Sequence, residues 1–207
     1  MSAKRGFDVA VSSLGLLVLA PAMLAIAAWI RLDSAGPVLF RQDRVGRHGR
    51  VFRIHKFRTM RADAAGPLLT VGDDRRVTRA GVWLRRTKLD ELPQLWNVLR
   101  GDMSLVGPRP EVPHYVALYT AAQRAVLLVR PGLTDPASLA WADEAATLAT
   151  FSDPHRAYAD VVMPQKLELS LTYLERRTVW SDLAVVMRTV AHVARSHLPV
   201  RLRERPT

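Results

Sequence analysis

One segment limits the fold of this chain more than any other. Residues 9–30 carry no charged side chain, and as an α-helix these 22 residues would measure roughly 33 Å, enough to cross the hydrocarbon core of a bilayer. A cleavable signal peptide also places basic residues, here Lys4 and Arg5, before an apolar run. This run is long for a signal, and no small-x-small cleavage site stands apart from the basic chain that follows. The segment therefore predicts a membrane anchor.

The path of this anchor through the membrane depends on Pro21. Within a helix, proline removes one backbone hydrogen bond and bends the axis. Basic residues flank both ends of the run: Lys4, Arg5, Arg31, Arg41 and Arg44. A straight span would place one basic cluster outside, against the positive-inside tendency, whereas a helix broken at Pro21 could enter and leave on one face. Membrane helices also tolerate proline, so these residues leave a spanning and a re-entrant helix both open.

The remaining chain has room for one compact domain, because 207 residues do not call for two cores. The net charge of +11 predicts attraction to phosphates, nucleic acid or anionic lipid. Residues 41–109 hold 16 Lys and Arg against 7 Asp and Glu, so the surplus is concentrated there. Such a region is either a basic face on anionic lipid or a diphosphate pocket with arginine forks. The 7% aromatic content is poor for base stacking, and the absence of cysteine excludes a thiolate metal site.

Hydrophobic periodicity and turn residues predict an α/β chain that is mainly helical. A short β-hairpin is expected, with strands at 38–41 and 51–57 joined by a turn at 46–49. Residues 61–74 are expected to form a loop. Helices are expected at 78–86, 90–100, 112–129, 165–177 and 181–197. The last two are amphipathic, which is typical of helices that pack on a core or a membrane surface.

The strongest chemical signal is the pair Asp90 and Glu91, which follows Arg85, Arg86 and Lys88 at a predicted helix start. The helix dipole and these cations favour ionised carboxylates at neutral pH. An ionised carboxylate can attack phosphorus or hold magnesium against a diphosphate. Simple helix capping explains the same residues without chemistry. The sequence contains neither a glycine-rich phosphate loop nor a histidine pair at metal-ligand spacing.

Longer motifs surround this pair. They are GPVLFRQ at 36–42, FRIHKFRTM at 52–60, LDELPQLWNVL at 89–99 and GDMSLVGPRP at 101–110. Together they resemble the bacterial sugar transferase family, the monotopic polyprenyl-phosphate phosphoglycosyl transferases, in its minimal catalytic form. RPGLT at 130–134 and the stretch around Lys166 and Tyr173 extend the resemblance, which runs from Lys4 to about Thr189.

The resemblance implies a two-step enzyme on the cytoplasmic face of the bacterial inner membrane, with a re-entrant helix that breaks at Ala20 and Pro21. Asp90 would attack the β-phosphate of a UDP-sugar, release UMP and carry the phosphosugar until polyprenyl (undecaprenyl) phosphate accepts it. Glu91 would complete the dyad, and both carboxylates would hold Mg²⁺. Amphipathic interfacial helices would surround a compact catalytic core. The identity of the sugar stays open, as does the product that is initiated, an exopolysaccharide, an O-antigen or a glycoprotein glycan.

Further residues are placed near the substrate by the same resemblance. Arg109, between Pro108 and Pro110, would contact the nucleotide or a phosphate. Other candidates for binding phosphate oxygens are Lys56, Arg58, Arg76, Arg79 and Arg85. These residues would supply the positive charge that phosphoryl transfer requires.

The chain also departs from the family pattern. Ala20 stands where serine usually precedes the proline, so a hydroxyl that could bond back to the freed carbonyl is missing. Lys88 replaces a small hydroxyl residue, Arg75 a proline and Asp135 a glycine. These changes leave the dyad intact but could alter contacts with the donor.

These expectations divide the chain into an anchor at 1–32, a catalytic domain at 33–200 and a basic tail at 201–207. The expected partners are a UDP-sugar, polyprenyl phosphate and membrane lipid, without nucleic acid. A homodimer is considered, although no residue pattern specifies one. The alternatives are a membrane-tethered nucleic-acid-binding protein and a non-catalytic membrane scaffold. Paired carboxylates inside the basic region argue against both, since they would repel a nucleic-acid backbone.

Overall fold

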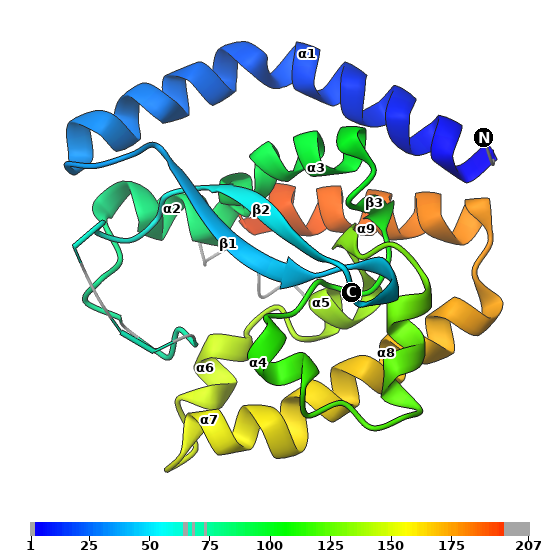
Figure 1. Ribbon diagram of the computed structural model, residues 1–207. Helices are drawn as coiled ribbons and strands as arrows, with labels where there is room; N and C mark the ends of the chain where they lie inside the picture. Colours follow the sequence, from blue (N-terminus) through cyan, green and yellow to red (C-terminus); the bar gives the residue numbers. More distant parts are fainter. Residues whose placement is uncertain (1–2, 64–65, 68, 73, 197–207) are drawn as a thin grey trace, which may run out of the picture.

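The computed structural model describes the chain except residues 1–2, 64–65, 68, 73 and 197–207, so the predicted basic tail at 201–207 lies outside the described residues. The fold is mainly helical, and α1 arches over one side of it while α6 to α8 form the opposite side (Figure 1). The elements are, in chain order, α1 (Ala3–Asp33), β1 (Leu39–Val45), β2 (Val51–Phe57), α2 (Arg79–Thr87), the 3₁₀ helix η2 (Leu89–Gln94), α3 (Leu95–Arg100), β3 (Ser104–Val106), α4 (Pro113–Val116), the 3₁₀ helix η3 (Gln123–Leu128), β4 (Gly132–Thr134), α5 (Pro136–Ala140), α6 (Glu144–Leu148), α7 (Pro154–Ala157), α8 (Met163–Arg176) and α9 (Val179–Ser196).

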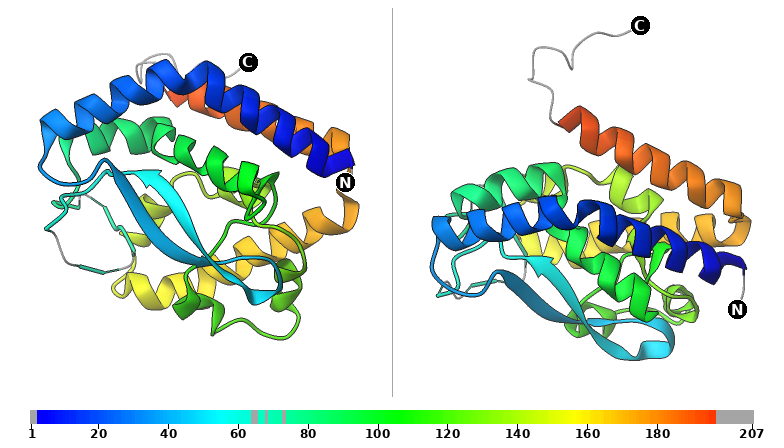
Figure 2. Two further views of the ribbon diagram at one scale, coloured as in Figure 1. Left: turned by 45° about the horizontal axis from the view of Figure 1, so that its top comes forward. Right: turned by 90° about the horizontal axis from the view of Figure 1, so that it is seen from above.

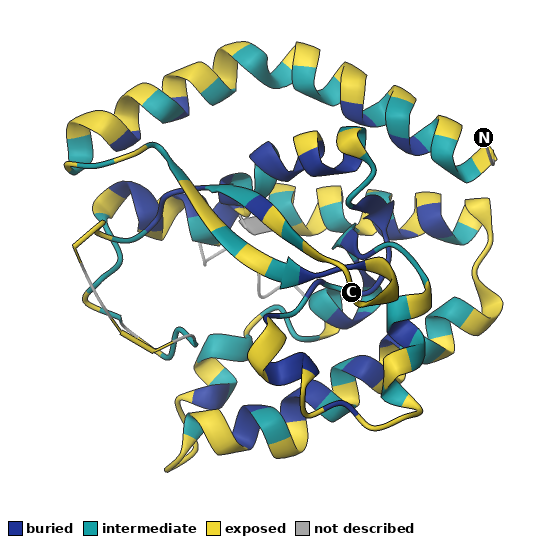
Figure 3. Cartoon of the chain, in the orientation of Figure 1, coloured by how far each residue is buried: buried dark blue, intermediate teal, exposed yellow. Residues whose placement is uncertain are grey.

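α1 contains the predicted membrane anchor. Its most apolar 18-residue window has a mean hydropathy of 2.3 and is 11% buried, so among the described residues this is the helix long and apolar enough to cross a bilayer. The helix continues through Ala20 and Pro21 and bows over the molecule in Figure 1. Figure 3 shows exposed residues along its outer side. α1 therefore keeps most of its apolar surface uncovered by the rest of the chain.

A buried carboxylate fixes the start of α1. Asp8 is 2% exposed, and its oxygens accept hydrogen bonds from Ser104 Oγ at 2.8 Å and from Leu105 N at 3.2 Å. Lys4 Nζ lies 3.2 Å from Asp8 Oδ1 and 2.6 Å from Asp182 Oδ2 of α9. This polar cluster ties α1 to β3 and to α9 at once.

A second contact joins α1 to α3. The Arg5 guanidinium donates to Val98 O at 2.6 Å and to Leu99 O at 2.8 Å. Gly101, with φ of 92°, ends α3 beside it. Arg5 thus adds donors to carbonyls in the last turn of α3, where Val98 O also accepts from Gly101 N at 3.0 Å.

β1 and β2 form the predicted hairpin. They pair antiparallel, with Leu39 opposite Phe57 and Val45 opposite Val51. β1 is longer than the predicted 38–41, because its end is also tied by Val45 N, which donates to Glu111 O at 2.9 Å. The hairpin packs across η2.

The chain around the carboxylate pair differs from the predicted helix at 90–100. α2 is confirmed, with the Thr78 hydroxyl accepting from Gly81 N at 3.0 Å as an N-cap. Lys88 then adopts a left-handed conformation, with φ of 56°, and the 3₁₀ helix η2 precedes α3. The prediction of one helix was wrong here because Lys88 redirects the backbone and Pro93 has no N–H for an α-helical bond.

β3 and β4 pair in parallel, Ser104 with Gly132 and Val106 with Thr134. The pair was not predicted, because strands of three residues carry too little alternation to be recognised. A Cβ on Gly132 would lie 2.2 Å from Gly107 N, so close approach of the two segments requires glycine. This pairing positions the loop that carries Arg109.

The predicted helix at 112–129 was wrong. α4 ends at Val116, and η3 begins only at Gln123. Between them, Thr120 N donates to Gln123 Oε1 at 2.9 Å and Gln123 N donates to Thr120 Oγ1 at 3.3 Å. This reciprocal capping box starts a new element inside the apolar pattern, and its T-x-x-Q signal was present in the sequence.

The two helices predicted at 165–177 and 181–197 are confirmed as α8 and α9 within the described residues. α5, α6 and α7 were not predicted. α7 continues through one turn of π-helix, Tyr158–Val162, into α8. Tyr158 and Val162 are buried with α4 side chains in one core cluster, so this segment closes the side of the molecule opposite α1.

Candidate active site

A cavity of about 950 Å³ lies beside the hairpin. Its lining comes from β1, β2, η2, the loop after β3, and the segment from α5 to α9. Charged residues that line it include Lys56, Arg85, Lys88, Asp90, Glu91 and Arg109. The volume is within the range of small-molecule sites, about 300–1,000 Å³.

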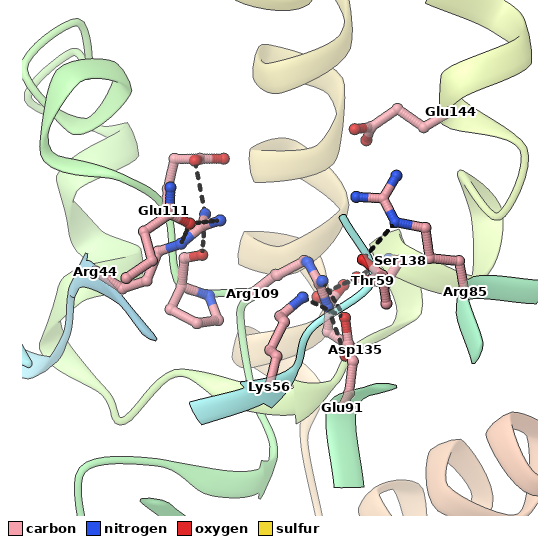
Figure 4. A network of polar contacts seen from close by, with 12 residues as sticks. Arg44, Lys56, Thr59, Arg85, Glu91, Arg109, Glu111, Asp135, Ser138 and Glu144 are labelled. Atoms are coloured by element: carbon pink, nitrogen blue, oxygen red, sulfur yellow. Dashed lines mark hydrogen bonds and ion pairs between the residues drawn. The ribbon is translucent and has the colours of Figure 1, made fainter. Parts of the chain in front are cut away.

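Glu91 is the centre of an ion cluster in this cavity (Figure 4). Lys56 Nζ donates to Glu91 Oε1 at 2.8 Å. Arg109 donates from Nη2 to Oε1 at 2.5 Å and from Nη1 to Oε2 at 3.2 Å, a two-pronged contact that fixes the carboxylate. Lys56 lies 35 residues and Arg109 18 residues from Glu91 in the chain, so only the fold brings these predicted residues together.

Asp90 has a different environment from its neighbour. Its residue exposure is 7%, and no hydrogen-bond partner for its Oδ1 exists within the described part of the chain. Lys56, Lys88 and Arg85 act on it through their charges. A buried acceptor without a donor is rare in folded proteins and marks a place where a ligand or ion can bind.

The two carboxylates also differ in pKa. Burial raises the pKa of Asp90, and the charge of Lys56 only partly offsets this. Burial acts in the same direction on Glu91, but the charges and hydrogen bonds of Arg109 and Lys56 outweigh it and hold the pKa of that carboxyl well below its usual range. The sequence predicted that neighbouring positive charge favours the ionised form of both carboxyls. This effect dominates at Glu91, whereas burial dominates at Asp90.

The cations of the cavity are themselves partly buried. Burial lowers the pKa of Lys56, while the charge of Glu91 acts against that shift. Burial likewise lowers the pKa of Arg85, whose Nε donates to Thr59 Oγ1 at 3.0 Å. Glu91 raises the pKa of Arg109. The cavity thus holds a fixed anion, cations, and a second carboxylate of which one oxygen has no hydrogen-bond partner in the described ranges.

Residues 1–196 match the model of the family described as bacterial sugar transferase. The chain belongs to the bacterial sugar transferase family. The resemblance inferred from the motifs is therefore confirmed, and the match includes the apolar helix α1 as well as the residues around the cavity.

Named relatives of this family member carry related activities. The UDP-glucose:undecaprenyl-phosphate glucose-1-phosphate transferase of Caulobacter vibrioides is 41% identical over 204 residues, 90% of this chain and 68% of the relative. The undecaprenyl-phosphate glucose phosphotransferase of Komagataeibacter xylinus is 40% identical over 202 residues, 92% and 35% of the two chains. The UDP-N-acetylgalactosamine-undecaprenyl-phosphate N-acetylgalactosaminephosphotransferase of Aeromonas hydrophila is 37% identical over 192 residues, 90% and 42%. The chain thus spans less than half the length of the Komagataeibacter xylinus and Aeromonas hydrophila relatives.

Two of the arginines implied by the family resemblance make contacts within the protein. Arg58 is 4% exposed and donates to Ala35 O and Ser34 O, both at 2.7 Å, so it holds the turn between α1 and β1. Arg76 pairs with Asp74 at 2.6 Å in the loop before α2. Both line the cavity. The chain itself engages the donors of Arg76 and the two Nη groups of Arg58, whereas the buried Arg58 Nε has no hydrogen-bond partner among the described residues.

The remaining predicted residues frame the site. Arg79 is exposed, and the described lining of the cavity does not include it. The two prolines around Arg109 act through their carbonyls: Pro108 O accepts from Gly132 N at 2.9 Å, and Pro110 O accepts from Arg44 Nη1 at 3.1 Å. These bonds hold the loop so that Arg109 reaches Glu91.

The dyad fits the Mg²⁺ that the family resemblance implies. Among the described residues, no group of three or more His, Cys, Asp or Glu side chains could hold a metal ion by itself. Mg²⁺ is commonly bound by one or two carboxylates together with substrate phosphates. The unpaired Oδ1 of Asp90 beside Glu91 suits that kind of site, in which a diphosphate would complete the coordination.

Sequence reasoning missed several polar residues that line the cavity. Glu111 accepts from Arg44 Nη1 at 3.0 Å and from the Tyr158 hydroxyl. Glu144 Oε2 accepts from Lys166 Nζ at 2.5 Å. Glu111 directly follows the 108–110 motif, which could have drawn attention to it. Arg44, Tyr158, Glu144 and Lys166 come from separate segments of the chain, so no local sequence pattern indicates that they line one cavity.

Proposed function

We propose that this protein transfers a phosphosugar from a UDP-sugar to polyprenyl phosphate, undecaprenyl phosphate in bacteria, and thereby initiates glycoconjugate assembly. The observation that carries the proposal is the contrast within the dyad. Glu91 is held by two cations, while Asp90 Oδ1 lies buried in the cationic cavity with no described partner. The names of the relatives, which are sugar-phosphate transferases acting on undecaprenyl phosphate, support the same reaction class.

In the first step, an ionised oxygen of Asp90 attacks the β-phosphorus of the UDP-sugar. The bond between this phosphorus and the oxygen that bridges the two phosphates breaks, and UMP leaves with that oxygen and the bonding electrons. The sugar phosphate stays on Asp90 as an acyl phosphate. Lys56, Arg85 and Arg109 stabilise the charge that develops on the phosphate oxygens.

In the second step, a phosphate oxygen of polyprenyl phosphate attacks the same phosphorus. The bond from phosphorus to the Asp90 oxygen breaks, which restores the carboxylate and yields polyprenyl-diphosphate-sugar. Both nucleophiles are anions, so neither step requires a separate base. Glu91, ionised and fixed, keeps Lys56 and Arg109 in position for both steps.

Asp90 and Glu91 are the residues that would hold Mg²⁺, which when bound would neutralise charge on the diphosphate. The protein's own contribution is to keep the Glu91 oxygens ionised and to leave Asp90 Oδ1 without a donor from the residues that the structure describes.

The proposed location is the cytoplasmic face of the bacterial inner membrane. α1 lies beside α2 and α3, as Figure 2 shows, and the ion pair between Lys4 and Asp182 joins its start to α9. Large apolar side chains are exposed on each of these helices: Leu17 and Leu24 on α1, Trp83 on α2, Trp96 on α3, and Trp180 and Met187 on α9. Tryptophan is enriched at membrane–water interfaces, which suits helices lying in the interface around a re-entrant α1.

The test is UMP release from a panel of UDP-sugars by the purified protein in detergent, with Mg²⁺ and undecaprenyl phosphate. We expect release with a subset of sugars, dependence on Mg²⁺, and loss in Asp90→Asn. Incubation with donor alone should leave phosphosugar covalently attached to the wild type, as a mass increase that the variant lacks.

Two outcomes would overturn the proposal. Folded protein that releases no UMP from any donor would return attention to the scaffold alternative. Release that persists in Asp90→Asn, without a covalent adduct in the wild type, would exclude Asp90 as the nucleophile.

A further inference from the structure

The part of the cavity formed by α5 to α8 has a chemistry that the proposed steps do not use. Trp141, Glu144 and Lys166 line it. Glu144 Oε2 lies 2.5 Å from Lys166 Nζ, and the two side chains are 27% and 15% exposed. This pair therefore combines an acceptor and a donor on a cavity wall, partly shielded from bulk water.

The backbone and neighbouring side chains hold this pair in place. Lys166 Nζ lies 5.7 Å from the ring centre of Tyr158, whose hydroxyl donates to Glu111. Glu144 N donates to Trp141 O at 3.2 Å, so the carboxylate and the indole belong to one turn. Side chains fixed in this way can discriminate between ligands, because binding costs them little conformational entropy.

The pair and the dyad face one cavity, because Glu144 and Lys166 line the same space as Asp90, Glu91 and Arg109. Figure 4 shows Glu144 on the same side of the ion cluster as Arg85. Glu144 is already paired with Lys166, so this wall offers little net positive charge to a phosphate and suits a neutral group that both donates and accepts hydrogen bonds.

The uncharged part of a nucleotide sugar nearest the reacting phosphorus is the sugar itself, since it is bonded directly to the β-phosphate. A pyranose presents hydroxyls that both donate and accept hydrogen bonds, which matches a carboxylate beside an ammonium. Its C–H face packs against aromatic rings such as that of Trp141. Relatives of this chain are named for glucose and for N-acetylgalactosamine, so recognition of the sugar differs within the family.

On the basis of the proposed function, we infer that Glu144, Lys166 and Trp141 form the subsite that recognises the hydroxyl groups of the transferred sugar. Glu144 accepts from sugar hydroxyls, Lys166 donates to them, and Trp141 covers the apolar face of the ring. The dyad and its cations bind the diphosphate that all UDP-sugars share.

The experiment compares Glu144→Gln with Asp143→Asn, a neighbouring exposed residue at which the same loss of charge should have no effect. For the donor preferred by the wild type, we expect Glu144→Gln to raise KM about tenfold or more and to reduce the preference among UDP-glucose, UDP-galactose and their N-acetylated forms. Inhibition by UMP, which lacks the sugar, should stay unchanged. Trp141→Phe provides a second variant, with a smaller increase in KM, and thermal melting verifies that each variant is folded.

Binding of UMP and of each UDP-sugar to Asp90→Asn, with and without Glu144→Gln, separates this inference from the proposed function. Sugar-dependent binding that Glu144→Gln removes would support the subsite even if no donor were turned over. An equal loss of UMP and UDP-sugar binding would assign this wall to the nucleotide and overturn the inference. Unchanged donor preference in both folded variants would also overturn it.

Discussion

Asp8 and Asp90 are both buried, with residue exposures of 2% and 7%, yet their surroundings are opposite. Asp8 accepts hydrogen bonds from Ser104 and Leu105 and lies beside Lys4. Asp90 Oδ1 has no hydrogen-bond partner among the described residues. The fold thus satisfies one buried carboxylate at the start of α1 and leaves part of the other unsatisfied in the cavity.

The difference separates a structural charge from a reactive one. A buried carboxylate with donors and a cation contributes to stability, because removing it would leave those donors unpaired. A buried carboxylate oxygen without a hydrogen-bond donor lowers stability, and such a loss of stability is typical of residues that take part in catalysis. Changes at Asp8 should therefore affect folding, and changes at Asp90 should affect the reaction.

The largest expected effect is that of Asp90→Asn on activity. We expect UMP release to fall by about 10³-fold or more, because the amide cannot replace the anionic nucleophile. Stability at neutral pH should not fall. Since burial raises the pKa of Asp90 in the folded protein, its ionisation costs stability as pH rises through that pKa, and the amide removes this cost. Activity and thermal melting of the same preparation test both statements, and a large loss of stability would contradict the comparison.

Asp8→Ala should have the opposite profile. It leaves Ser104 Oγ and Leu105 N without their acceptor, at about 2–4 kcal/mol of unfolding free energy. Asp43→Ala is the control, because its ion pair with Arg53 is exposed and should be worth less than about 1 kcal/mol. Chemical denaturation in detergent measures both, and equal effects would show that burial of Asp8 does not matter.

Lys56→Met sharpens the contrast within the dyad. The charge of Lys56 lowers the pKa of Asp90 against the effect of burial, so its removal should raise that pKa further. Activity is lost as pH falls through the pKa of the nucleophile, and the acid limb of the pH profile should move to higher pH in the variant. The maximal rate should also fall by about 10²-fold, as is typical when one donor to a developing anion is removed. If the acid limb of the variant stayed at the wild-type pH, the loss of activity at low pH would not be caused by protonation of Asp90.

The smallest effect is expected at Lys88, the left-handed residue just before the dyad. Lys88→Gly should increase the unfolding free energy by about 1 kcal/mol or less, because glycine adopts positive φ without a Cβ penalty. Lys88→Ala removes the same charge but keeps the Cβ, so it should show no gain. Thermal melting distinguishes the two, and equal changes would mean that φ at this position is not a source of strain.

Local patterns predicted much of the fold and the dyad. The hairpin follows from alternation between turn residues, α2 from its Thr78 cap, and α8 and α9 from helical periodicity. Asp90 and Glu91 stand together in the sequence among cations, so their chemistry could be inferred without a structure. The family resemblance added Lys56 and Arg109.

The unequal roles of the two carboxylates could not be predicted in this way. Lys56 arrives from β2 and Arg109 from the loop after β3, and both contact Glu91 rather than Asp90. In the sequence, Asp8 is an ordinary charged residue just before the uncharged run. Its burial and its hydrogen bond with Ser104 are visible only in the fold. Glu144 and Lys166 meet only because the segment from α6 to α8 folds back on itself.

The ion pair between Lys4 of α1 and Asp182 of α9 has a consequence for biogenesis. During synthesis α1 is made well before its partner on α9. Until α9 leaves the ribosome, the Lys4 and Asp8 side chains lack part of their ion cluster, and α1 lacks the ion pair that joins it to α9. Nascent chains that stall before α9 would therefore hold the start of α1 against β3 and α3 without this third attachment.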